Sequence, residues 1–415
     1  MTPDLAEAAR RAARRYGTPL QLTDLARLDA DARAVRDAFG DPWIRLYALK
    51  ANGLPALTSR LPGAGFGATA VSRGELELAR RAGFPAASVA LEGIGKTDAE
   101  LRAVVRAAAA GAPYLWTSLE TAEEAARLAA LARAAGVQPD VLVRVNPEVT
   151  PETHAGLAVG APASRFGILP DELPELVDAG GGPDGPLRWR GLHLHVGSQL
   201  GAMDAWRAAL RRVLRLLALQ RGGGRGWDTL DAGSGFPADH AGDGSVPPLA
   251  LFAQAAADEL AALPADARPA RCAIEPGRIV VAASGTLVAR VLHVRERTPR
   301  IVILDAGMTE LIRPALYGAV HPIAALTSRG RPVVPGAGPV TRVRVDGPVC
   351  ESTDRLGMAD LPPLVRGDLV AIGMTGAYGS AMASRYNGRP APPEIGWDGS
   401  ALQLLRRRGR LDALP

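Results

Sequence analysis

The alternation of short apolar runs with helical patterns is the feature that most constrains the fold of this 415-residue chain. From about residue 35 to residue 270, each apolar run is followed by an amphipathic segment that ends near glycine or proline. Such alternation is typical of β-α-β units. The strand candidates are IRLYALKA (44–51), FGATAV (66–71), SVALEG (88–93), YLWTSL (114–119), VLVRVN (141–146), RFGI (165–168), GLHLHVG (191–197) and TLDAGSGF (229–236).

Eight strand–helix units in about 235 residues match the size of a (β/α)8 barrel, which we predict for residues 31–270. A doubly wound open sheet is the structural alternative, because the strand count alone does not exclude it. After residue 270 the chain carries strand-like runs without long helices, which predicts an antiparallel β domain over residues 271–415. Residues 1–30 include a short strand candidate, TPLQLTDL, which we expect to pack with that domain.

Composition argues against several classes of function. The net charge is +5 and the arginines are scattered through amphipathic helices, so a nucleic-acid-binding surface is not indicated. No run approaches the roughly 20 apolar residues of a membrane span, and the N-terminus lacks a signal-peptide pattern, so we expect a cytoplasmic protein without membrane association. Cys272 and Cys350 are too few for a disulfide framework and lack metal-ligand spacing, so no metal site is predicted.

The choice of basic residues points to one side chain. Arginine supplies 46 of the 48 basic residues, and the only lysines are Lys50 and Lys96. An imine with a carbonyl cofactor requires a primary amine that can lose its proton. Lys50 ends the first strand candidate, which is where (β/α)8 enzymes place active-site residues. Lys96 lies in a GKT segment, but Ala90 occupies the position of the first glycine of a nucleotide-binding loop, so we interpret Lys96 as structural.

Other polar residues follow the later strand candidates. His195 and Ser198 come at the end of the seventh, and Gly233–Gly235 close the eighth in a turn whose N–H groups suit a phosphate. Glu275, in the sequence EPGR, is a carboxylate that could keep a pyridine nitrogen protonated. Taken singly, each is better explained as an ordinary turn or core residue. Their common position at the ends of strands favours a site.

Six segments, in order along nearly the whole chain, carry a recognisable resemblance. They are YALKAN around Lys50, HVGSQ from His195, EPGR from Glu275, DAGMTELIRPALYGAVH from Asp305, GPVCESTDRLG from Gly347 and GAYGSAMASRYNGRP from Gly376. Together these segments resemble the diaminopimelate decarboxylase family, whose members are fold type III pyridoxal phosphate enzymes.

The resemblance implies an alanine-racemase-like barrel followed by a Greek-key β domain, in a head-to-tail homodimer whose partner chain completes each site. It implies pyridoxal 5'-phosphate as the cofactor, held as an imine on Lys50, with His195 stacked on the ring and Glu275 at the pyridine nitrogen. The further cofactor contacts that it implies are Arg144, Ser198, Gly235, Gly277, Arg278 and Tyr378.

The same resemblance implies decarboxylation of meso-2,6-diaminopimelate to L-lysine and CO2. Cys350 would return a proton to the carbanion that remains when CO2 departs. A guanidinium suits a distal carboxylate and Glu351 suits a distal ammonium, so Arg313 favours diaminopimelate over ornithine, lysine or arginine. The implied substrate contacts are Arg278, Arg313, Tyr317, Glu351 and Tyr378.

The chain also departs from the usual family pattern. Thr69 replaces an acidic residue, Gly156 and Val159 replace a tyrosine and a threonine, and Ser234 interrupts a glycine triplet. A decarboxylase of the same mechanism that acts on another amino acid with a distal carboxylate is therefore the nearest alternative. An amino-acid racemase would need acid–base groups on both faces of Cα, and a non-catalytic carrier of the cofactor would not need the β domain with its Cys350.

Overall fold

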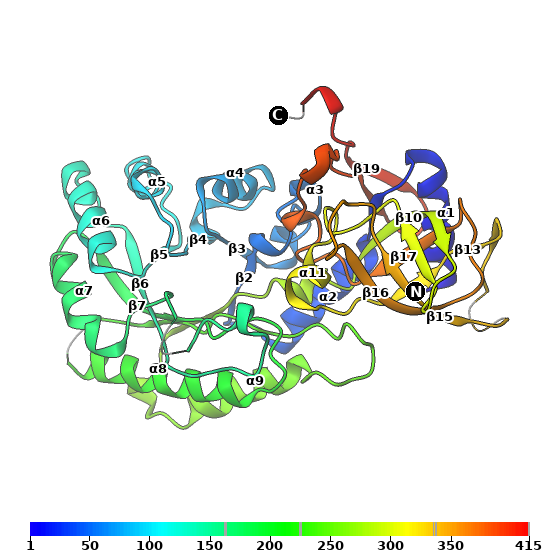
Figure 1. Cartoon of the computed structure of the whole chain (residues 1–415). Helices are drawn as coiled ribbons and strands as arrows, with labels where there is room; N and C mark the ends of the chain where they lie inside the picture. Colours follow the sequence, from blue (N-terminus) through cyan, green and yellow to red (C-terminus); the bar gives the residue numbers. More distant parts are fainter. Residues whose placement is uncertain (162–163, 224–225, 335, 337, 414–415) are drawn as a thin grey trace. The chain divides into compact units, whose positions relative to one another are not determined.

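The computed structural model describes residues 1–161, 164–223, 226–334, 336 and 338–413, and it divides into two compact units (Figure 1). The barrel unit comprises Ala32–Pro237 and Ser245–Gly277. The β unit comprises Met1–Asp31, Ala238–Gly244 and Arg278–Pro415. No helix in the described part of the chain combines the length and the apolar composition that a membrane span needs.

The barrel unit is built on a closed barrel of eight parallel strands with helices outside it (Figure 1). The barrel closes where β2 pairs with β9, through Ile44 with Ala273 and Arg45 with Ile274. This closure confirms the predicted (β/α)8 fold and excludes the open sheet. In barrel order the strands are β2 (Ile44–Ala48), β3 (Gly67–Ala70), β4 (Val89–Leu91), β5 (Trp116–Leu119), β6 (Asp140–Val145), β7 (Arg188–Leu194), β8 (Thr229–Asp231) and β9 (Arg271–Ile274).

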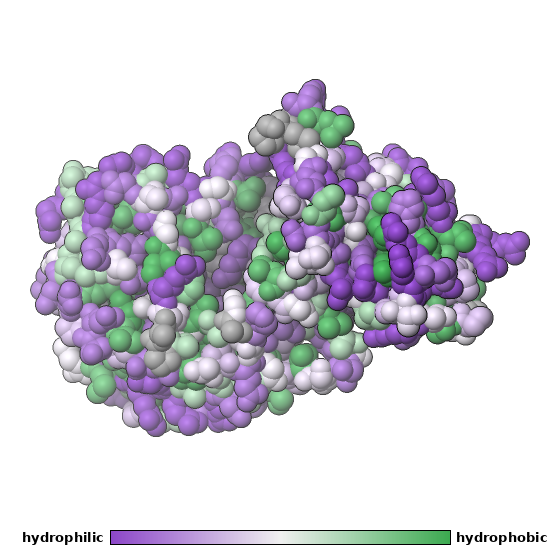
Figure 2. Space-filling model, viewed as in Figure 1, coloured by the Kyte–Doolittle hydropathy of each residue, from purple (hydrophilic) through white to green (hydrophobic). Residues whose placement is uncertain are grey.

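The outer helices form where the sequence supplies caps and an amphipathic pattern. Ser72, Thr97 and Thr121 cap the N-termini of α4, α5 and α6, because their side-chain oxygens accept backbone N–H groups of the first turn. The outward faces of α5 and α6 are mainly hydrophilic in Figure 2. The helices are α2 (Leu25–Ala38), which begins in the β unit, α3 (Pro55–Thr58), α4 (Arg73–Arg81), α5 (Asp98–Ala109), α6 (Ala122–Ala135), α7 (Leu173–Ala179), α8 (Asp204–Gly222) and α9 (Leu249–Ala261).

The predicted strand RFGI (165–168) is wrong. Only Ile168 forms an isolated parallel bridge, to Val145, and Gly167 has φ +71°, which is incompatible with a strand. The barrel takes its last strand from β9 instead, so the predicted end of the barrel at residue 270 is also wrong. Glu275 consequently follows the last barrel strand directly.

The barrel interior changes from apolar to polar along its strands. A buried apolar cluster contains Leu46, Ala90, Trp116, Leu142 and Ala273. Alternate residues of a strand point to the same face, so the interior positions two residues further along are 48, 92, 118, 144 and 275. Four of these carry buried polar side chains: Glu92, Ser118, Arg144 and Glu275. A polar layer thus lies above an apolar floor, at the carboxyl ends of the strands.

The β unit holds a nine-stranded sheet in the order β16–β15–β11–β10–β1–β18–β19, with β17 pairing to β10 and β12. The sheet of the predicted antiparallel domain is in fact mixed, because β1 pairs with β18 and β11 with β15 in parallel. Parallel partners are joined by long connections, which local alternation in a sequence does not reveal. The strands are β1 (Leu20–Asp24), β10 (Gly285–Arg295), β11 (Ile301–Leu304), β12 (Ile323–Ala325), β15 (Thr341–Asp346), β16 (Arg355–Leu361), β17 (Leu369–Gly373), β18 (Glu394–Trp397) and β19 (Leu402–Arg406), beside the separate pair β13 (Thr327–Ser328) and β14 (Arg331–Pro332).

The N-terminal residues are part of this β unit. Strand β1 pairs with both β10 and β18. Helix α1 (Pro3–Tyr16) buries four alanines, Ala8, Ala9, Ala12 and Ala13, in one apolar cluster with Leu20 and Leu22 of β1. Two short helices, α10 (Arg278–Val281) and α11 (Arg313–Tyr317), carry arginines that the sequence singles out.

Candidate active site

Lys50 lies just beyond the carboxyl end of β2, in the 3-10 turn Leu49–Ala51. Leu49 and Ala51 are buried while Lys50 is exposed, so the neighbours anchor the turn and the amine stays accessible. The charge of Lys50 acts to lower the pKa of both Glu92 and Glu275, which places the amine near these carboxyls. The lysine predicted from composition is therefore at the polar end of the barrel.

Three acidic side chains are buried together in the barrel: Glu92 after β4, Asp231 at the end of β8 and Glu275 after β9. Burial, and then the charge of Asp231, raises the pKa of Glu275 to about 7. Burial also raises the pKa of Glu92 and of Asp231 well above the usual range. Oxygen Oε1 of Glu275 has no hydrogen-bond partner among the described residues, so it is available to an N–H group of a ligand.

Two histidines of β7 and the turn after it, His193 and His195, are spaced to point the same way. Nδ1 of His193 lies 3.0 Å from Ser118 Oγ, and its Nε2 lies 3.7 Å from Glu275 Oε1. The backbone N–H of Ser234 donates to His195 Nδ1 at 3.3 Å, which orients that ring. Burial, followed by nearby cations, lowers the pKa of both histidines well below the usual range, so both rings are neutral at pH 7.

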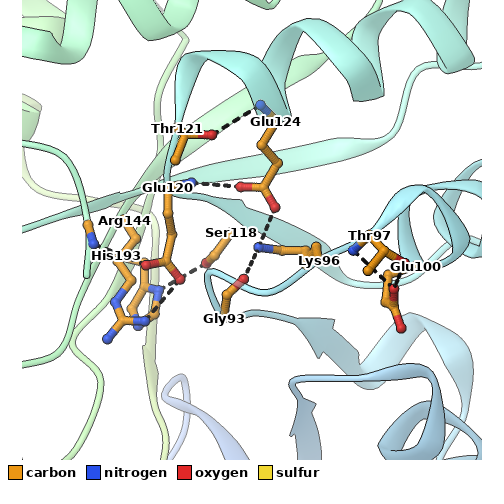
Figure 3. Close-up of polar contacts among 11 residues, drawn as sticks. Gly93, Lys96, Thr97, Glu100, Ser118, Glu120, Thr121, Glu124, Arg144 and His193 are labelled. Atoms are coloured by element: carbon orange, nitrogen blue, oxygen red, sulfur yellow. Dashed lines mark hydrogen bonds and ion pairs between the residues drawn. The ribbon is translucent and has the colours of Figure 1, made fainter. Parts of the chain in front are cut away.

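Arg144, near the end of β6, is held from two sides. Its Nη1 donates to Glu120 Oε1 at 3.0 Å, and the guanidinium carbon lies 5.0 Å from the centre of the Phe166 ring. The other oxygen of Glu120 accepts the backbone N–H of Gly167 at 3.0 Å. Figure 3 shows the Arg144 side chain beside Glu120 and His193. The guanidinium is therefore fixed in direction before any ligand binds.

The second lysine, Lys96, is wholly buried in an ion pair. Its Nζ lies 2.7 Å from Glu124 Oε1 and donates to the carbonyl of Gly93 at 2.5 Å. Glu124 also accepts the backbone N–H of Glu120 at 2.9 Å (Figure 3). Through Glu124, Lys96 thus supports the segment that carries Glu120, the partner of Arg144. These contacts agree with the structural role predicted for Lys96.

The glycine turn after β8 is packed too tightly for side chains. Gly233 has φ +58°, and a Cβ there would lie 2.1 Å from the carbonyl oxygen of Leu194. Gly235 has φ +124°, and its Cβ would lie 2.6 Å from Leu200 Cδ1. The N–H of Leu200 donates to the carbonyl of Gly235 at 3.1 Å, which ties this turn to the loop that contains Ser198. Backbone groups therefore form the surface that a phosphate would meet.

Gly277, at the end of the barrel unit, is a third glycine whose backbone packs closely against neighbouring residues. A Cβ at this position would lie 3.0 Å from the Cβ of Ala48 and 3.2 Å from that of Ala51. The backbone N–H of Ala48 donates to the carbonyl of Pro276 at 3.1 Å. The EPGR turn is thus seated against the same turn that carries Lys50.

The β unit gathers a second group of predicted residues. The guanidinium carbon of Arg278 lies 4.8 Å from the centre of the Tyr378 ring. Arg313 is 3% exposed, and its Nη1 donates to His321 Nε2 at 2.9 Å. Nδ1 of His321 lies 3.0 Å from the carbonyl oxygen of Gly373. Because a guanidinium only donates and a carbonyl only accepts, His321 is held as the neutral tautomer with its proton on Nδ1.

This second group has positive charge and no charged histidine. Burial, and then the charge of Arg313, lowers the pKa of His321 to about 4 and that of His240 to about 2. The two rings meet edge to face with centres 5.1 Å apart. Burial, and then Arg278, lowers the pKa of Arg313 to about 10, so the guanidinium remains charged at pH 7. Tyr317 also acts on the pKa of both arginines, which places its phenol near them. The group is suited to an anion.

Cys350 and Glu351 lie in the loop between β15 and β16, and both are exposed. The backbone N–H of Cys350 donates to Asn387 Oδ1 at 3.0 Å, and that of Val349 donates to Asp354 Oδ2 at 2.7 Å. The loop backbone is therefore fixed while the thiol and the carboxylate face outward.

The predicted residues are thus divided between the two units. Arg278, Arg313, Tyr317 and Tyr378 belong to the β unit, together with the exposed Cys350 and Glu351. The other predicted residues lie in the barrel unit: Lys50, Arg144, His195, Ser198, Gly235, Glu275 and Gly277.

Sequence reasoning missed several polar residues of both groups: Glu92, Glu120, His193, Asp231, His240 and His321. The rule that strand ends carry chemistry could have found Glu92 and His193, since both lie in strand candidates of the sequence. Donor atoms of Glu92, His193 and Glu275 lie within 4.8 Å of one another. No local pattern singles out His240.

The class of protein follows from this barrel with its lysine, its buried carboxyls and its glycine turn. The chain belongs to the pyridoxal-dependent decarboxylases, because the family model described as "Pyridoxal-dependent decarboxylase, pyridoxal binding domain" matches residues 25–282. Among curated relatives, diaminopimelate decarboxylase of Deinococcus radiodurans is 38% identical over 403 residues, which cover 96% of this chain and 94% of the relative. The enzyme of that name from Pseudomonas aeruginosa is 36% identical, with 98% of this chain and 94% of the relative covered.

Solved structures agree with the sequence relatives. Diaminopimelate decarboxylase from Helicobacter pylori, complexed with L-lysine, is similar to this chain with a TM-score of 0.88 and 29% identity, covering 97% of each chain. The enzyme from M. jannaschii, in co-complex with L-lysine, has a TM-score of 0.88 and 27% identity, with 97% of this chain and 92% of the other covered. These matches confirm the family that the six segments predicted.

Proposed function

We propose that this protein uses pyridoxal 5'-phosphate to decarboxylate meso-2,6-diaminopimelate, giving L-lysine and CO2. The observation that carries the proposal is the position of Lys50 and Glu275 after the carboxyl ends of two paired barrel strands, β2 and β9, where the amine acts on the pKa of the buried carboxyl. Relatives that bear the name diaminopimelate decarboxylase extend over nearly the whole chain, which supports the substrate.

The barrel residues fit this cofactor. The amine of Lys50 would hold it covalently, and Glu275 Oε1, which has no partner among the described residues, would accept the ring N–H. His195 would stack on the ring. The glycine turn, which a Cβ at Gly235 would obstruct, would receive the phosphate, with Ser198, Gly277 and Arg278 beside it. When bound, the cofactor supplies an electron sink for the pair of electrons left at Cα as CO2 departs.

The role of Arg144 is to present a fixed positive charge. Glu120 and Phe166 hold its guanidinium from two sides, so the side chain loses little conformational entropy when a ligand arrives. Its charge also acts to lower the pKa of Glu275, which favours the ionised carboxylate that a protonated ring nitrogen requires.

The β-unit residues support a diamino diacid as substrate. Arg313 is charged and buried, and its Nε has no hydrogen-bond partner among the described residues, so a distal carboxylate would satisfy it. Arg278, Tyr317 and Tyr378 would complete this pocket. Glu351 would receive the distal ammonium. Ornithine, lysine and arginine lack the distal carboxylate and would leave Arg313 without its partner.

Cys350 and Glu351 are exposed on the β unit, which supports a site completed by a second copy of the chain in a homodimer. The Cys350 thiol would hold the proton that passes to Cα after CO2 leaves. A cytoplasmic location fits the two free cysteines, which are typical of reducing compartments.

A panel assay of CO2 release tests the proposal. We expect turnover of meso-diaminopimelate by the protein loaded with pyridoxal phosphate, and turnover of ornithine, lysine and arginine at least about 100-fold slower. Racemisation of an amino acid without CO2 release would contradict the proposed reaction.

A second candidate is a decarboxylase of the same mechanism for another amino acid with a distal carboxylate. Gly156 and Val159 favour it, because they replace larger or polar residues of the family pattern in the segment between β6 and α7. The same panel, extended to such diacids, distinguishes the two candidates. Turnover of another diacid without turnover of diaminopimelate would select the second.

A further inference from the structure

Glu92 and Glu275 lie against each other in the interior of the barrel. The backbone N–H of Glu92 donates to the carbonyl of Ala70 at 2.8 Å, which fixes Glu92 at the end of β4 beside β3. Glu92 is 4% exposed and Glu275 is 3% exposed. A carboxyl oxygen of Glu92 lies within 4.8 Å of one of Glu275, and each carboxyl group acts on the pKa of the other. Two acidic side chains therefore lie close together in the buried interior of the barrel.

A hydrogen bond between two carboxyl groups requires a proton. An ionised carboxylate only accepts, so one of the two groups must be a carboxylic acid that donates to the other. Two buried carboxylates in contact would also repel each other, and burial makes the charged form of each costly. The pair therefore carries one proton and one negative charge.

The proposed function decides which group keeps the proton. Burial raises the pKa of both Glu92 and Glu275. The charged groups that act on the pair are Lys50 and Arg144, which lower the pKa of both acids, and Asp231, which raises that of Glu275. In the proposed function Glu275 accepts the ring N–H as a carboxylate, so the proton of the pair resides on Glu92.

His193 completes the arrangement without adding charge. Its Nδ1 lies 4.0 Å from Glu92 Oε1 and its Nε2 lies 3.7 Å from Glu275 Oε1. Burial lowers the pKa of His193 well below the usual range, so the ring is neutral and Ser118 Oγ satisfies its Nδ1. The negative charge of Glu275 is consequently not neutralised by this histidine.

We propose that Glu92 is a positioning residue for Glu275: as a carboxylic acid it donates to one oxygen of Glu275 and leaves Oε1 directed to the cofactor as the accepting oxygen. This inference rests on the proposed function, in which Glu275 meets the ring nitrogen. Glu92 touches neither the substrate nor the cofactor in this role. It sets the charge and the direction of the carboxylate that does.

Two variants distinguish the hydrogen bond that Glu92 donates from the space that its side chain fills. Glu92→Gln keeps a donor at the same distance along the side chain, whereas Glu92→Met keeps the length and removes the donor. In Glu92→Met, Glu275 loses the bond that stabilises its ionised form, so its pKa rises further. Glu77→Gln, at an exposed site on α4, controls for the loss of an acidic residue.

The readout is the dissociation constant of pyridoxal phosphate from the full-length protein, measured by absorbance between pH 6 and pH 9. We expect Glu92→Gln and Glu77→Gln to bind within about 3-fold of the wild type. Glu92→Met should bind at least about 10-fold more weakly at pH 7, because more of its Glu275 is protonated, and should recover as the pH rises. Circular dichroism and thermal melting establish that each variant is folded.

An infrared measurement tests the same inference on the wild type and Glu92→Gln alone. The apo wild type at pH 7 should show the carbonyl stretch of a protonated carboxyl group that is missing from Glu92→Gln. The inference is overturned if that band is absent, if Glu92→Met binds the cofactor like the wild type at every pH, or if Glu92→Gln is impaired as strongly as Glu92→Met. A wild-type protein that does not bind pyridoxal phosphate would overturn the proposed function instead.

Discussion

The position of a residue along its barrel strand decides whether its side chain packs in the core or faces the polar site. Trp116 and Ser118 lie on one strand and point the same way, yet the first belongs to the apolar floor and the second contacts His193. A shift of two residues toward the carboxyl end therefore separates packing from chemistry. Lys50 and Glu275 follow the carboxyl ends of β2 and β9, which agrees with the proposed role of the Lys50 amine.

The first prediction concerns that amine. In Lys50→Arg the positive charge stays, but a guanidinium does not form the covalent link that an amine forms, so decarboxylation should fall by at least about 1000-fold. The absorbance of the covalently held cofactor should be lost with it. Lys96→Arg is the matched control, because an arginine keeps the ion pair with Glu124, and its cofactor absorbance should remain. Normal turnover by Lys50→Arg would exclude Lys50 from the chemistry.

The second prediction concerns His321. Its proton on Nδ1 and its acceptor at Nε2 require the neutral ring, and its pKa is lowered to about 4. Because the folded pKa lies below the unfolded value near 6.5, this residue stabilises the fold fully above about pH 6.5, and the contribution is lost as the pH falls toward 4. The loss between pH 7 and pH 4.5 should be about 2 to 3 kcal/mol.

Urea unfolding at pH 7 and pH 4.5 measures this effect as a difference between proteins. His321→Gln keeps an acceptor for Arg313 but does not titrate, so its stability should fall by about 2 to 3 kcal/mol less than that of the wild type over this interval. His154→Gln provides an exposed control. Equal pH dependence in the wild type and His321→Gln would contradict the assignment of a neutral, buried ring.

Residues that the sequence did not identify share a physical cause. The pattern SVALEG contains Glu92 and the pattern GLHLHVG contains His193, but whether a strand-end polar residue faces the interior depends on the register of the closed barrel. His240 and His321 are about 80 residues apart and meet only in the folded β unit. By contrast, Lys50 and Glu275 stand at strand ends and lie in segments with recognisable patterns, so both could be proposed before the fold was known.

At the scale of elements, the errors arise where tertiary pairing overrides local pattern. The run RFGI is apolar enough for a strand, but Gly167 turns the chain and its N–H binds Glu120. The run RCAI in β9 is short and begins with a polar residue, yet it pairs with β8 on one side and β2 on the other, which closes the barrel. Barrel closure depends on the pairing of all eight strands, so the sequence of one segment does not predict it.

The third prediction concerns the buried pair that joins two elements, Lys96 and Glu124. Both side chains are almost fully buried, so Lys96→Met leaves an unpaired carboxylate and should destabilise the barrel unit by about 3 to 5 kcal/mol. The double variant Lys96→Met with Glu124→Leu removes both charges and should recover most of that loss. Chemical unfolding of the two proteins measures the difference.

An exposed pair is the control for this prediction. Arg80 and Glu77 form an ion pair on the surface of α4 with side chains 74% and 52% exposed, so Arg80→Ala should leave stability unchanged within error. If the double variant at Lys96 and Glu124 is as unstable as the single variant, the loss of stability does not come from an unpaired carboxylate, and the prediction is contradicted.

At the scale of the whole molecule, the predicted residues are divided between two units that each fold around a core of their own. The barrel unit provides Lys50 and Glu275, and the β unit provides Arg313 and Cys350. The sequence could assign these residues to two domains, but it could not say whether one chain supplies a complete site. Cys350 and Glu351 are exposed, which agrees with the proposal that they act on a substrate bound to a second copy.

The last prediction tests that sharing directly. In a homodimer with shared sites, a hybrid of Lys50→Ala and Cys350→Ala subunits has one site with both defects and one with neither. Equal mixing with free exchange makes about half of the dimers hybrids, so activity should rise from near zero to about a quarter of the wild-type value. Refolding each variant alone is the control and should give no recovery. If tagged subunits exchange but activity does not return, each site is built from one chain, and Cys350 would have to reach the barrel of its own molecule.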